Sequence, residues 1–317
     1  MSSPTFHRLL AAGVAVTLVE GAACLPPAEA GAEPKQPPLA APTRCGAIAN
    51  PAVGESSGIV PSRRCPGLFW THNDSGNPPT LYAIDADGKS TGQCRLQGAR
   101  NVDWEDIAMD EAGKLYVADV GNNTRSGRVL TIYAVPEPDP KKTGQATAEA
   151  AARFRYPSGH GPFDCEAMFV RKGWAYLITK EVAGARLYRV RLAGAPGGIA
   201  RAEALGPLPG AAWITAADIA PDGRHIAALS YSAVYVYDLP APLEELVEAG
   251  ATGPSGSTRP AEAIRQSPRK RAVRLGQCEA ICWIPGKDAA DLLITNEQRD
   301  MYRLAAAVGA AASAPSR

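Results

Sequence analysis

The sequence predicts an all-β fold, a five-bladed β-propeller, on three observations. One polar motif returns along the chain, as GESSGIVP, NVDWEDIAMD, FDCEAMFV, ITAADIAP and GQCEAICW. Its aligned positions, Glu55, Asp103, Asp164, Thr215 and Gln277, give a period of roughly 50–60 residues, within the range of propeller repeats. Each copy opens a unit with room for four short strands joined by turns.

The strands of each unit follow in order. The first strands are the apolar runs Ser57–Val60, Glu105–Met109, Glu166–Val170, Ala217–Ala220 and Glu279–Ile284. Tight turns such as DEAGK, RKG and PDGR lead to the second strands, LFWTH, LYVAD, AYLITK, IAALS and LLITN. The third strands are LYAID, LTIYAV, LYRVRL, AVYVYDL and MYRLA, and the fourth are QCRLQG, ARFRYP, RAEALGPL and RAVRLG. The fifth unit lacks its fourth strand, and RCGAIANP near the N-terminus can supply it, which closes the ring and removes open sheet edges.

Two other architectures compete with this prediction. A ring of six blades is the alternative propeller, and a β-sandwich does not explain why one motif returns at a near-constant spacing. Residues 240–268 form an insertion in the fourth unit, with a short helix over PLEELVEAG. The basic residues that follow have no interleaved aromatic residues, which indicates a solvated loop rather than a nucleic-acid contact; they are Arg265, Arg269, Lys270, Arg271 and Arg274.

The ends of the chain indicate export. Residues 1–30 have the apolar run and the small-residue cleavage site of a signal peptide, so we expect a secreted or periplasmic protein. Lipid attachment at Cys24 is the alternative. Residues 31–44 are predicted to be a disordered Pro/Ala-rich linker, 45–305 the propeller and 306–317 a disordered tail.

Six cysteines follow the predicted cleavage site: Cys45, Cys65, Cys94, Cys165, Cys278 and Cys282. An even number in an exported chain favours disulfides, although the sequence does not select a pairing. Buried free thiols are the alternative for the last three.

Composition limits the partners. The 317 residues are 21% charged and carry a net charge of +1, so no overall field attracts nucleic acid or an anionic membrane. No segment after the signal peptide is apolar enough to span a membrane. We expect a monomer that binds a small molecule or an extracellular polymer.

Polar side chains are expected to converge at one mouth of the propeller, because the first strand starts and the second strand ends on the same face. The candidate metal ligands are Asp103, Glu105, Asp164, Glu166 and Glu279. The candidate ligand-binding residues are Glu55, Ser57, Asn73, Asp119, Lys180, Tyr231, Asn296 and Glu297. Crowded carboxylates repel one another, and a calcium ion with its six to eight oxygen ligands would relieve that repulsion. Pairing with Lys180, or capping of loop amides, are the alternatives.

Two histidines, His72 and His160, could act as a general acid–base pair beside a carboxylate; surface histidines in polar loops are the alternative. Trp104, Trp213 and Tyr231 could stack on a sugar or base, or pack in the core. The chain contains no nucleophile elbow, P-loop, dinucleotide fingerprint or HExxH motif.

With the segments ESSGIV, DWEDIA, LYVADVGNN and DCEAMFV, residues 45–305 resemble secreted bacterial β-propeller proteins of the NHL and phytase-like-esterase kind. The repeated first-strand glutamates are also similar to those of soluble calcium-activated nucleotidases (apyrases), five-bladed propellers with calcium in the channel. That resemblance implies hydrolysis of nucleoside di- or triphosphates, with Glu105, Glu166 and Glu279 around the metal and Ser57 as a neutral ligand. The chain departs from it at Ala217, and only Lys180 and Arg125 are candidates to bind phosphates.

Two functional hypotheses follow. The first is a secreted propeller that binds a ligand or partner, with a divalent cation, at the acidic mouth of the central channel. The alternative is a calcium-dependent hydrolase of phosphate or other esters. The fold does not separate them, since propellers host both functions.

Overall fold

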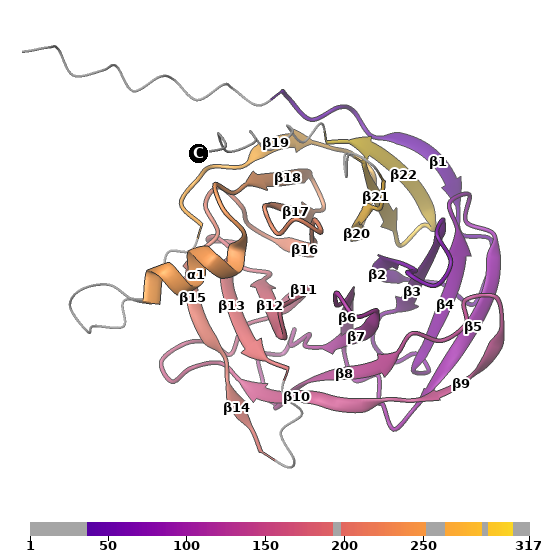
Figure 1. Ribbon diagram of the computed structural model, residues 1–317, viewed down its shortest axis with the longest axis horizontal. Coiled ribbons are helices and arrows are strands. Elements are labelled where there is room, and N and C mark those ends of the chain that lie inside the picture. Colours follow the sequence, from indigo (N-terminus) through magenta and orange to yellow (C-terminus); the bar gives the residue numbers. More distant parts are fainter. Residues whose placement is uncertain (1–36, 193–197, 252–263, 287–290, 307–317) are drawn as a thin grey trace, which may run out of the picture. The chain divides into compact units, whose positions relative to one another are not determined.

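Five β-sheets surround a central axis in the computed structural model, which describes residues 37–192, 198–251, 264–286 and 291–306 (Figure 1). Each sheet is one blade of a β-propeller, as predicted. Its first strand lies nearest the axis, and the chain then moves outward through successive antiparallel strands.

The strands of each blade are given from the axis outward. Blade 1 contains β2 (Ser56–Pro61), β3 (Leu68–Asn73), β4 (Thr80–Asp85) and β5 (Ser90–Gln97). Blade 2 contains β6 (Trp104–Met109), β7 (Lys114–Asp119), β8 (Leu130–Pro136) and β10 (Glu149–Arg155). Blade 3 contains β11 (Cys165–Arg171), β12 (Trp174–Thr179), β13 (Arg186–Arg191) and β15 (Glu203–Pro207). Blade 4 contains β16 (Ile214–Ile219), β17 (His225–Ser230), β18 (Ala233–Asp238) and β19 (Arg269–Ala272). Blade 5 contains β20 (Cys278–Ile284), β21 (Asp291–Asn296), β22 (Asp300–Ala305) and β1 (Thr43–Ala47).

The N-terminal strand closes the ring. β1 pairs antiparallel with β22, with Thr43 opposite Arg303, so the first strand of the chain completes the last blade as predicted. The described part of the predicted linker is packed rather than free: Leu39 is buried, and the amide of Ala40 donates to the Ala305 carbonyl at 3.2 Å. The predicted signal peptide, Cys24 and residues 307–317 of the predicted tail lie outside the described residues.

Two further strands cross between blades, and the sequence analysis missed this arrangement. β9 (Thr143–Thr147) pairs parallel with the outer edge of blade 1, although it is connected to blade 2 on both sides. β14 (Ala200–Arg201) pairs in the same way with β10 of blade 2 before the chain enters β15. These strands cover two blade edges and tie neighbouring blades together.

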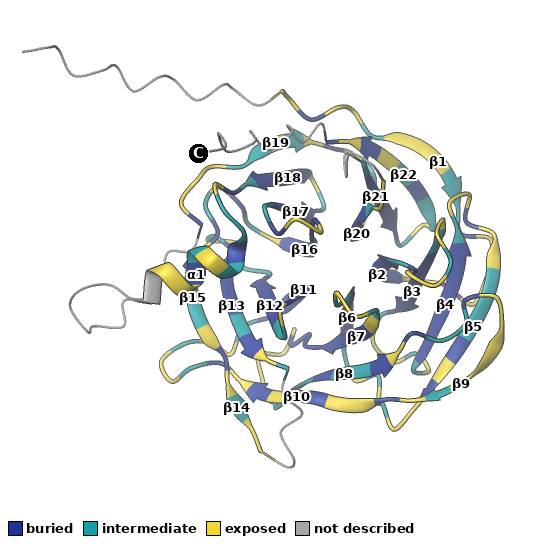
Figure 2. Ribbon diagram, viewed as in Figure 1, coloured by how far each residue is buried: buried dark blue, intermediate teal, exposed yellow. Residues whose placement is uncertain are grey.

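The inner strands are buried on both faces, because each blade packs between two neighbours (Figure 2). Every residue of β11 and of β17 is buried. The packing is aliphatic and aromatic; for example, the rings of Phe169 and Tyr176 stack with centroids 5.1 Å apart. Burial on both faces explains why hydrophobic alternation is blurred along these strands.

The predicted helix of the insertion is present as α1 (Leu243–Ala251). Leu243 and Val247 are buried against the core, and Glu244 forms an ion pair with Arg171 at 2.6 Å. The basic run differs from the predicted solvated loop, because part of it forms β19. There Arg269 binds both carboxylate oxygens of Asp238, at 2.7 and 2.9 Å, so its charge is used within the fold.

The described cysteines are all unpaired, so the expected disulfides are not formed among Cys45, Cys65, Cys94, Cys165, Cys278 and Cys282. Cys165, Cys278 and Cys282 are buried thiols, and burial raises the pKa of each. Among the described residues, no helix has the length and apolar character that a membrane span requires.

Candidate functional site

A β-bulge occurs at the same position of every inner strand. In blade 2, Trp104 opposes Asp119 and Asp106 opposes Ala118, which leaves Glu105 without a partner in the ladder. The corresponding bulge residues of the other blades are Ser57, Glu166, Thr215 and Glu279. Bulges redirect side chains and are frequent beside active sites. Here the bulge lies at the start of the strand, at the end of the axial channel that we call the acidic mouth.

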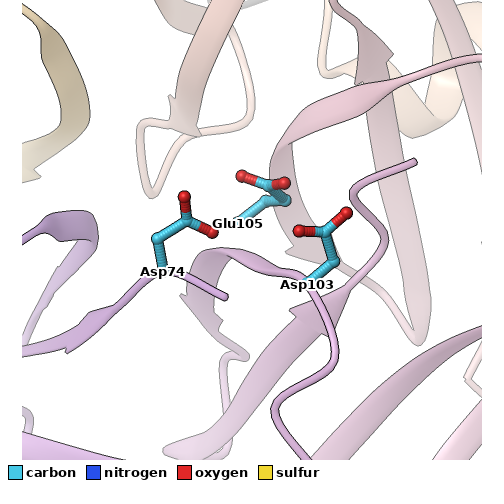
Figure 3. Close-up of side chains that lie close together, drawn as sticks. All are labelled: Asp74, Asp103 and Glu105. Atoms are coloured by element: carbon cyan, nitrogen blue, oxygen red, sulfur yellow. The ribbon is translucent and has the colours of Figure 1, made fainter. Parts of the chain in front are cut away.

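Five carboxylates gather at the acidic mouth in two overlapping groups. Asp74, Asp103 and Glu105 can each offer an oxygen so that these atoms lie within 4.8 Å of one another (Figure 3). Glu105, Asp164 and Glu166 form a second group, in which one carboxylate oxygen from each residue lies within 4.8 Å of the others. Glu105 belongs to both groups, and we call these five residues the carboxylate cluster.

Glu105 lies at the centre of the cluster and has no compensating partner. Its side chain is 4% exposed, and no described residue forms a hydrogen bond or an ion pair with its carboxylate. Burial raises its pKa well above the ordinary value, and the charges of Glu166 and Asp74 raise it further. A buried, unpaired carboxylate is costly unless it is protonated or binds a cation.

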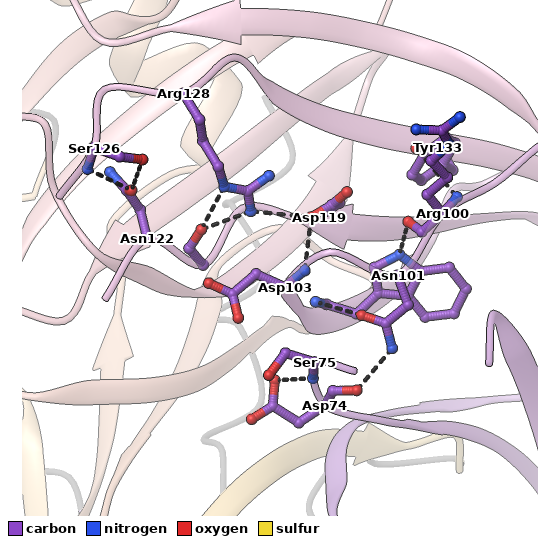
Figure 4. A network of polar contacts seen from close by, with 12 residues as sticks. Asp74, Ser75, Arg100, Asn101, Asp103, Asp119, Asn122, Ser126, Arg128 and Tyr133 are labelled. Carbon is purple, nitrogen blue, oxygen red and sulfur yellow. Dashed lines mark hydrogen bonds and ion pairs between the residues drawn. The ribbon is translucent and has the colours of Figure 1, made fainter. Parts of the chain in front are cut away.

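Loop contacts hold Asp74 and Asp103 in place (Figure 4). The Asn101 side chain donates to the Asp74 carbonyl at 2.7 Å, and the amide of Ser75 donates to the Asp74 carboxylate. The amide of Asp103 donates to the Asp119 carboxylate at 3.0 Å. Burial raises the pKa of Asp103 to about 6, with Asp74 adding to the effect. These contacts fix the backbone and leave the Asp103 carboxylate directed at the cluster.

Gly121 forms a wall of the cluster. A Cβ atom at this position would lie 2.6 Å from Asp103 Oδ2 and nearer still to Glu105 Oε1. Its carbonyl accepts hydrogen bonds from Arg128, which also pairs with Asp119 at 2.9 Å. The backbone therefore approaches the two carboxylates closely, which only a residue without a side chain permits.

A positive charge lies on the other side of the cluster. The ammonium group of Lys180 pairs with Glu166 and donates to the Tyr231 hydroxyl at 2.9 Å. The Tyr231 hydroxyl in turn donates to Glu279 at 3.0 Å. Burial raises the pKa of Glu166 to about 8, although Lys180 lowers it, and burial raises that of Glu279 to about 7. The structure thus contains the predicted pairing of Lys180 with an acid.

Asp164 combines two roles. One of its carboxylate oxygens accepts the amide of Asn122 at 2.9 Å, which is the predicted capping of a loop amide. It also belongs to the second group of the cluster. Glu279 belongs to neither group, because its carboxylate is held by Tyr231 on the far side of Lys180.

Several predicted ligand-binding residues support loops instead. The Ser57 hydroxyl donates to the Glu105 carbonyl at 3.1 Å, and Asp119 is paired with Arg128. Asn73 and Asn296 are buried, with side chains that donate to the carbonyls of Ala52 and Leu275. Glu55 and Glu297 lie nearer the solvent on the same face, and Glu297 accepts a bond from Gln277 at 3.0 Å.

The two histidines do not form an acid–base pair. His72 is fully buried between blades 1 and 2, where its ring packs edge-on against Trp104 at 5.6 Å. Burial lowers its pKa to about 4, so it stays neutral and out of reach of a ligand at the mouth. His160 bonds the Tyr188 hydroxyl at 2.8 Å and lines a separate pocket of about 190 Å³ with Arg155 and Arg201.

The three aromatic candidates lie in different surroundings. Trp104 is fully buried, and its indole donates to the Arg100 carbonyl at 2.8 Å, so it packs in the core. Trp213 is 50% exposed and lies edge-on to Tyr231, with centroids 6.4 Å apart. Trp213 and Tyr231 therefore form an accessible aromatic surface next to Lys180.

Two contributors to the site are not among the candidate residues chosen from the sequence. Asp74 follows the end of β3 on the predicted face, but nothing in the sequence separates it from the structural Asn73 beside it. Arg128 is eight residues along the loop after Val120, and its contacts with Asp119 and Gly121 depend on how that loop folds back.

The chain has a low similarity to several solved structures. A gluconolactonase from Xanthomonas campestris is 11% identical over 79% of this chain and 71% of its own, with a TM-score of 0.43. Glutaminyl cyclase from Myxococcus xanthus is 15% identical over 83% and 92% of the two chains, with a TM-score of 0.42. Virginiamycin B lyase from Staphylococcus aureus is 14% identical over 81% and 68%, with a TM-score of 0.39. No protein-family model and no curated protein sequence matches the chain.

At these values the similarity carries over no substrate and no site residue to this chain. The β-propeller architecture predicted from the sequence is confirmed by the chain's own five sheets. The narrower resemblance to NHL, phytase-like or nucleotidase propellers stays a prediction.

Proposed function

We propose that this propeller binds a divalent cation, with calcium preferred, in the carboxylate cluster and uses it to hold a small oxygen-rich ligand at the acidic mouth. The observation that carries the proposal is Glu105, which is buried, unpaired and shared by both carboxylate groups. A calcium ion takes six to eight oxygen ligands. Carboxylates that bind through one or both oxygens supply that number readily. Zinc fits less well, because no histidine or cysteine belongs to the cluster.

The charges favour the first group as the cation site. Lys180 already compensates Glu166 in the second group. Asp74, Asp103 and Glu105 have no ammonium group of their own, and Arg128 is engaged by Asp119 and by the Gly121 carbonyl. A cation held by these three residues, with Asp164 beside them, would relieve the repulsion that raises the pKa of Glu105 and Asp103.

The location and partners belong to the same proposal. We infer an exported monomer that meets its ligand outside the cytoplasm, either a small molecule or an extracellular polymer. The exposed ring of Trp213 next to Tyr231 offers such a ligand an apolar contact beside the polar cluster.

Thermal unfolding with and without calcium tests the cation site, since a ligand bound only by the folded state stabilises that state. At a calcium concentration 100 times Kd, the expected gain is about 2.7 kcal/mol. For a chain of this size that gain corresponds to roughly 5–10 °C in Tm. Asp103→Asn and Glu105→Gln should abolish the shift, whereas the exposed Glu149→Gln should retain it. A wild-type protein that shows no shift with calcium, magnesium or manganese contradicts the proposal.

A second candidate function is hydrolysis of phosphate or other esters, which the contact between Lys180, Tyr231 and Glu166 favours. A bound divalent cation would supply an activated water at neutral pH. Once it is deprotonated, which its pKa of about 8 allows above neutral pH, Glu166 could accept a proton, while Lys180 and the Tyr231 hydroxyl could donate hydrogen bonds to a developing oxyanion.

A panel of phosphate and carboxylate esters, with and without EDTA, distinguishes the two functions. Hydrolysis requires turnover that EDTA removes and calcium restores. Tyr231→Phe should then lower kcat with little change in KM, because the hydroxyl acts on the transition state. Calcium-dependent stabilisation without turnover of any ester supports binding alone.

A further inference from the structure

A small pocket of about 190 Å³ lies beside the loop that encloses the carboxylate cluster. Asn122 and Arg128 of that loop form one wall, and residues 156–162, between β10 and β11, form another. Arg155 at the end of β10 and Arg201 in β14 complete the lining. We call this site the basic pocket.

The charged residues that line the basic pocket are all arginines, namely Arg128, Arg155 and Arg201. Arg128 is compensated by the carboxylate of Asp119 at 2.9 Å. Arg155 and Arg201 form no ion pair with any carboxylate in the described part of the chain, and neither an aspartate nor a glutamate is among the lining residues. Two positive charges therefore remain uncompensated in the pocket.

The fold holds these two charges side by side. β14 pairs parallel with β10, and Arg201 lies directly opposite Arg155 in that ladder (Figure 1). The backbones of paired strands are only about 4.8 Å apart. Like charges in directly opposite positions repel each other and destabilise the pair. An anion bound between the two guanidinium groups would replace this repulsion with two attractions.

Both guanidinium groups are oriented and still have hydrogen-bond donors to offer. Arg155 donates from one nitrogen to the Gly127 carbonyl at 2.7 Å, and Arg201 donates from one nitrogen to the Tyr156 carbonyl at 2.9 Å. Each guanidinium group has five N–H donors, so a single bond to a carbonyl fixes its position and leaves most of them for a ligand.

The loop after β10 adds a third direction of approach. His160 lines the pocket, and its Nδ1 forms a hydrogen bond with the Tyr188 hydroxyl at 2.8 Å. The other ring nitrogen, Nε2, has no partner among the residues that the structure describes, so it remains for a ligand. Donors thus surround the pocket from β10, from β14 and from this loop.

We propose that the basic pocket binds a doubly charged tetrahedral oxyanion, a phosphate or sulfate group, between Arg155 and Arg201, with His160 as a further donor. The two uncompensated charges match a dianion, and guanidinium groups bind the oxygens of such an anion in pairs. The volume is below the range of sites that enclose a whole drug-sized ligand, so the pocket holds one group, which is either free or at the end of a larger molecule.

Isothermal titration of inorganic phosphate, and separately of sulfate, into the full chain at pH 8 tests the pocket. EDTA is present so that no divalent cation occupies the carboxylate cluster, and KCl keeps the ionic strength constant. The expected result is saturable binding of one anion per chain. The anion that binds more tightly identifies whether the natural ligand carries a phosphate or a sulfate group.

Variants locate the binding. Arg155→Gln and Arg201→Gln should each weaken the affinity at least tenfold, because each removes charge-assisted hydrogen bonds. Arg224→Gln is the matched control: this arginine also donates to a carbonyl, that of Pro240 at 3.3 Å, but lies in blade 4, and its loss should leave the affinity unchanged. Thermal unfolding confirms that each variant is folded.

Anions with a single charge test the ligand class. Acetate and dimethyl phosphate should bind at least tenfold more weakly than phosphate, since they match only one of the two guanidinium charges. Binding of either as tight as that of phosphate overturns the assignment to a dianion. No saturable binding of phosphate or sulfate, or wild-type affinity in folded Arg155→Gln and Arg201→Gln, overturns the site. Because EDTA is present throughout, these outcomes are independent of the cation proposed for the acidic mouth.

Discussion

Gly121 lies so close to Glu105 that a single methyl group between them would collide with the carboxylate. The backbone of the loop after β7 thus encloses the carboxylate cluster from one side, while Lys180 closes it from the other. A substitution at Gly121 can therefore test the carboxylate cluster without a change in any charged residue.

Gly121→Ala should weaken calcium binding at least tenfold, about 1.4 kcal/mol. The added methyl group would lie 2.6 Å from Asp103 Oδ2 and nearer still to Glu105 Oε1, so both ligands must move. Gly54→Ala is the matched control, because a Cβ at Gly54 meets no atom within 4 Å. Calcium titration monitored by Tm measures the difference, and equal affinities for the two variants would show that Glu105 and Asp103 do not bind the cation together.

Lys180→Met should tighten calcium binding several-fold and abolish any ester hydrolysis. The ammonium group pairs with Glu166 and repels a cation in the neighbouring group, so its removal lowers the electrostatic cost of binding. A lysine that serves only to stabilise the fold would leave the calcium affinity unchanged once the variant is folded. Weaker calcium binding in folded Lys180→Met would contradict the assignment of the cation to Asp74, Asp103 and Glu105.

The metal-free protein should lose stability between pH 6.5 and pH 8. A carboxyl group with a raised pKa holds more protons in the folded state, so the free energy of unfolding falls as pH rises between its two pKa values. That interval runs from 4.5 to about 8 for Glu166 and from 4.5 to about 7 for Glu279. His72 acts in the opposite direction, but only between about 4 and its ordinary value of 6.5.

Calcium should offset this loss, because it binds the deprotonated carboxylates. Urea unfolding at a series of pH values, in EDTA and in calcium, measures both curves. A metal-free protein that becomes more stable from pH 6.5 to pH 8 would mean that the cluster is not protonated in the folded state.

Gly88→Ala should destabilise the ring closure. Gly88 has a φ of +89°, and a Cβ there would lie 2.9 Å from the amide of Ile48 and nearer still to the Ala47 carbonyl, at the end of β1. The strain and the collision together should cost on the order of 3 kcal/mol. Gly67→Ala, at a φ of +85° with no atom within 4 Å, should cost only about 1 kcal/mol. Chemical denaturation compares them, and equal losses would show that the seam between β1 and blade 1 adds little to stability.

The architecture was predictable because turn residues and short apolar runs repeat at a regular spacing, and because RCGAIANP could complete only the last blade. β9 was not predictable, since its residues are mostly exposed and have no hydrophobic period. The pocket at the other end of the axial channel was not predictable either: Val60, Val170 and Ile219 are ordinary strand residues, and only the assembled ring shows that they line one pocket.

The candidate site was predictable only in part, because its geometry also depends on contacts between blades. Glu105 and Glu166 were placed at the mouth by strand period, and the structure adds the bulge that turns each of them out of the ladder. Glu279 has the same bulge, but Tyr231 holds its carboxylate away from the cluster. His72 has the polar neighbours of a site residue, and only the packing of blade 2 over blade 1 shows that it is enclosed. Contacts between blades cannot be read from one unit of the repeat.

Isothermal titration of calcium into the wild-type protein and into Glu105→Gln tests the central claim most directly. We expect saturable binding by the wild type, retained by Glu149→Gln and lost in a folded Glu105→Gln. No saturable binding by the wild type, or the same affinity in Glu105→Gln, would contradict it.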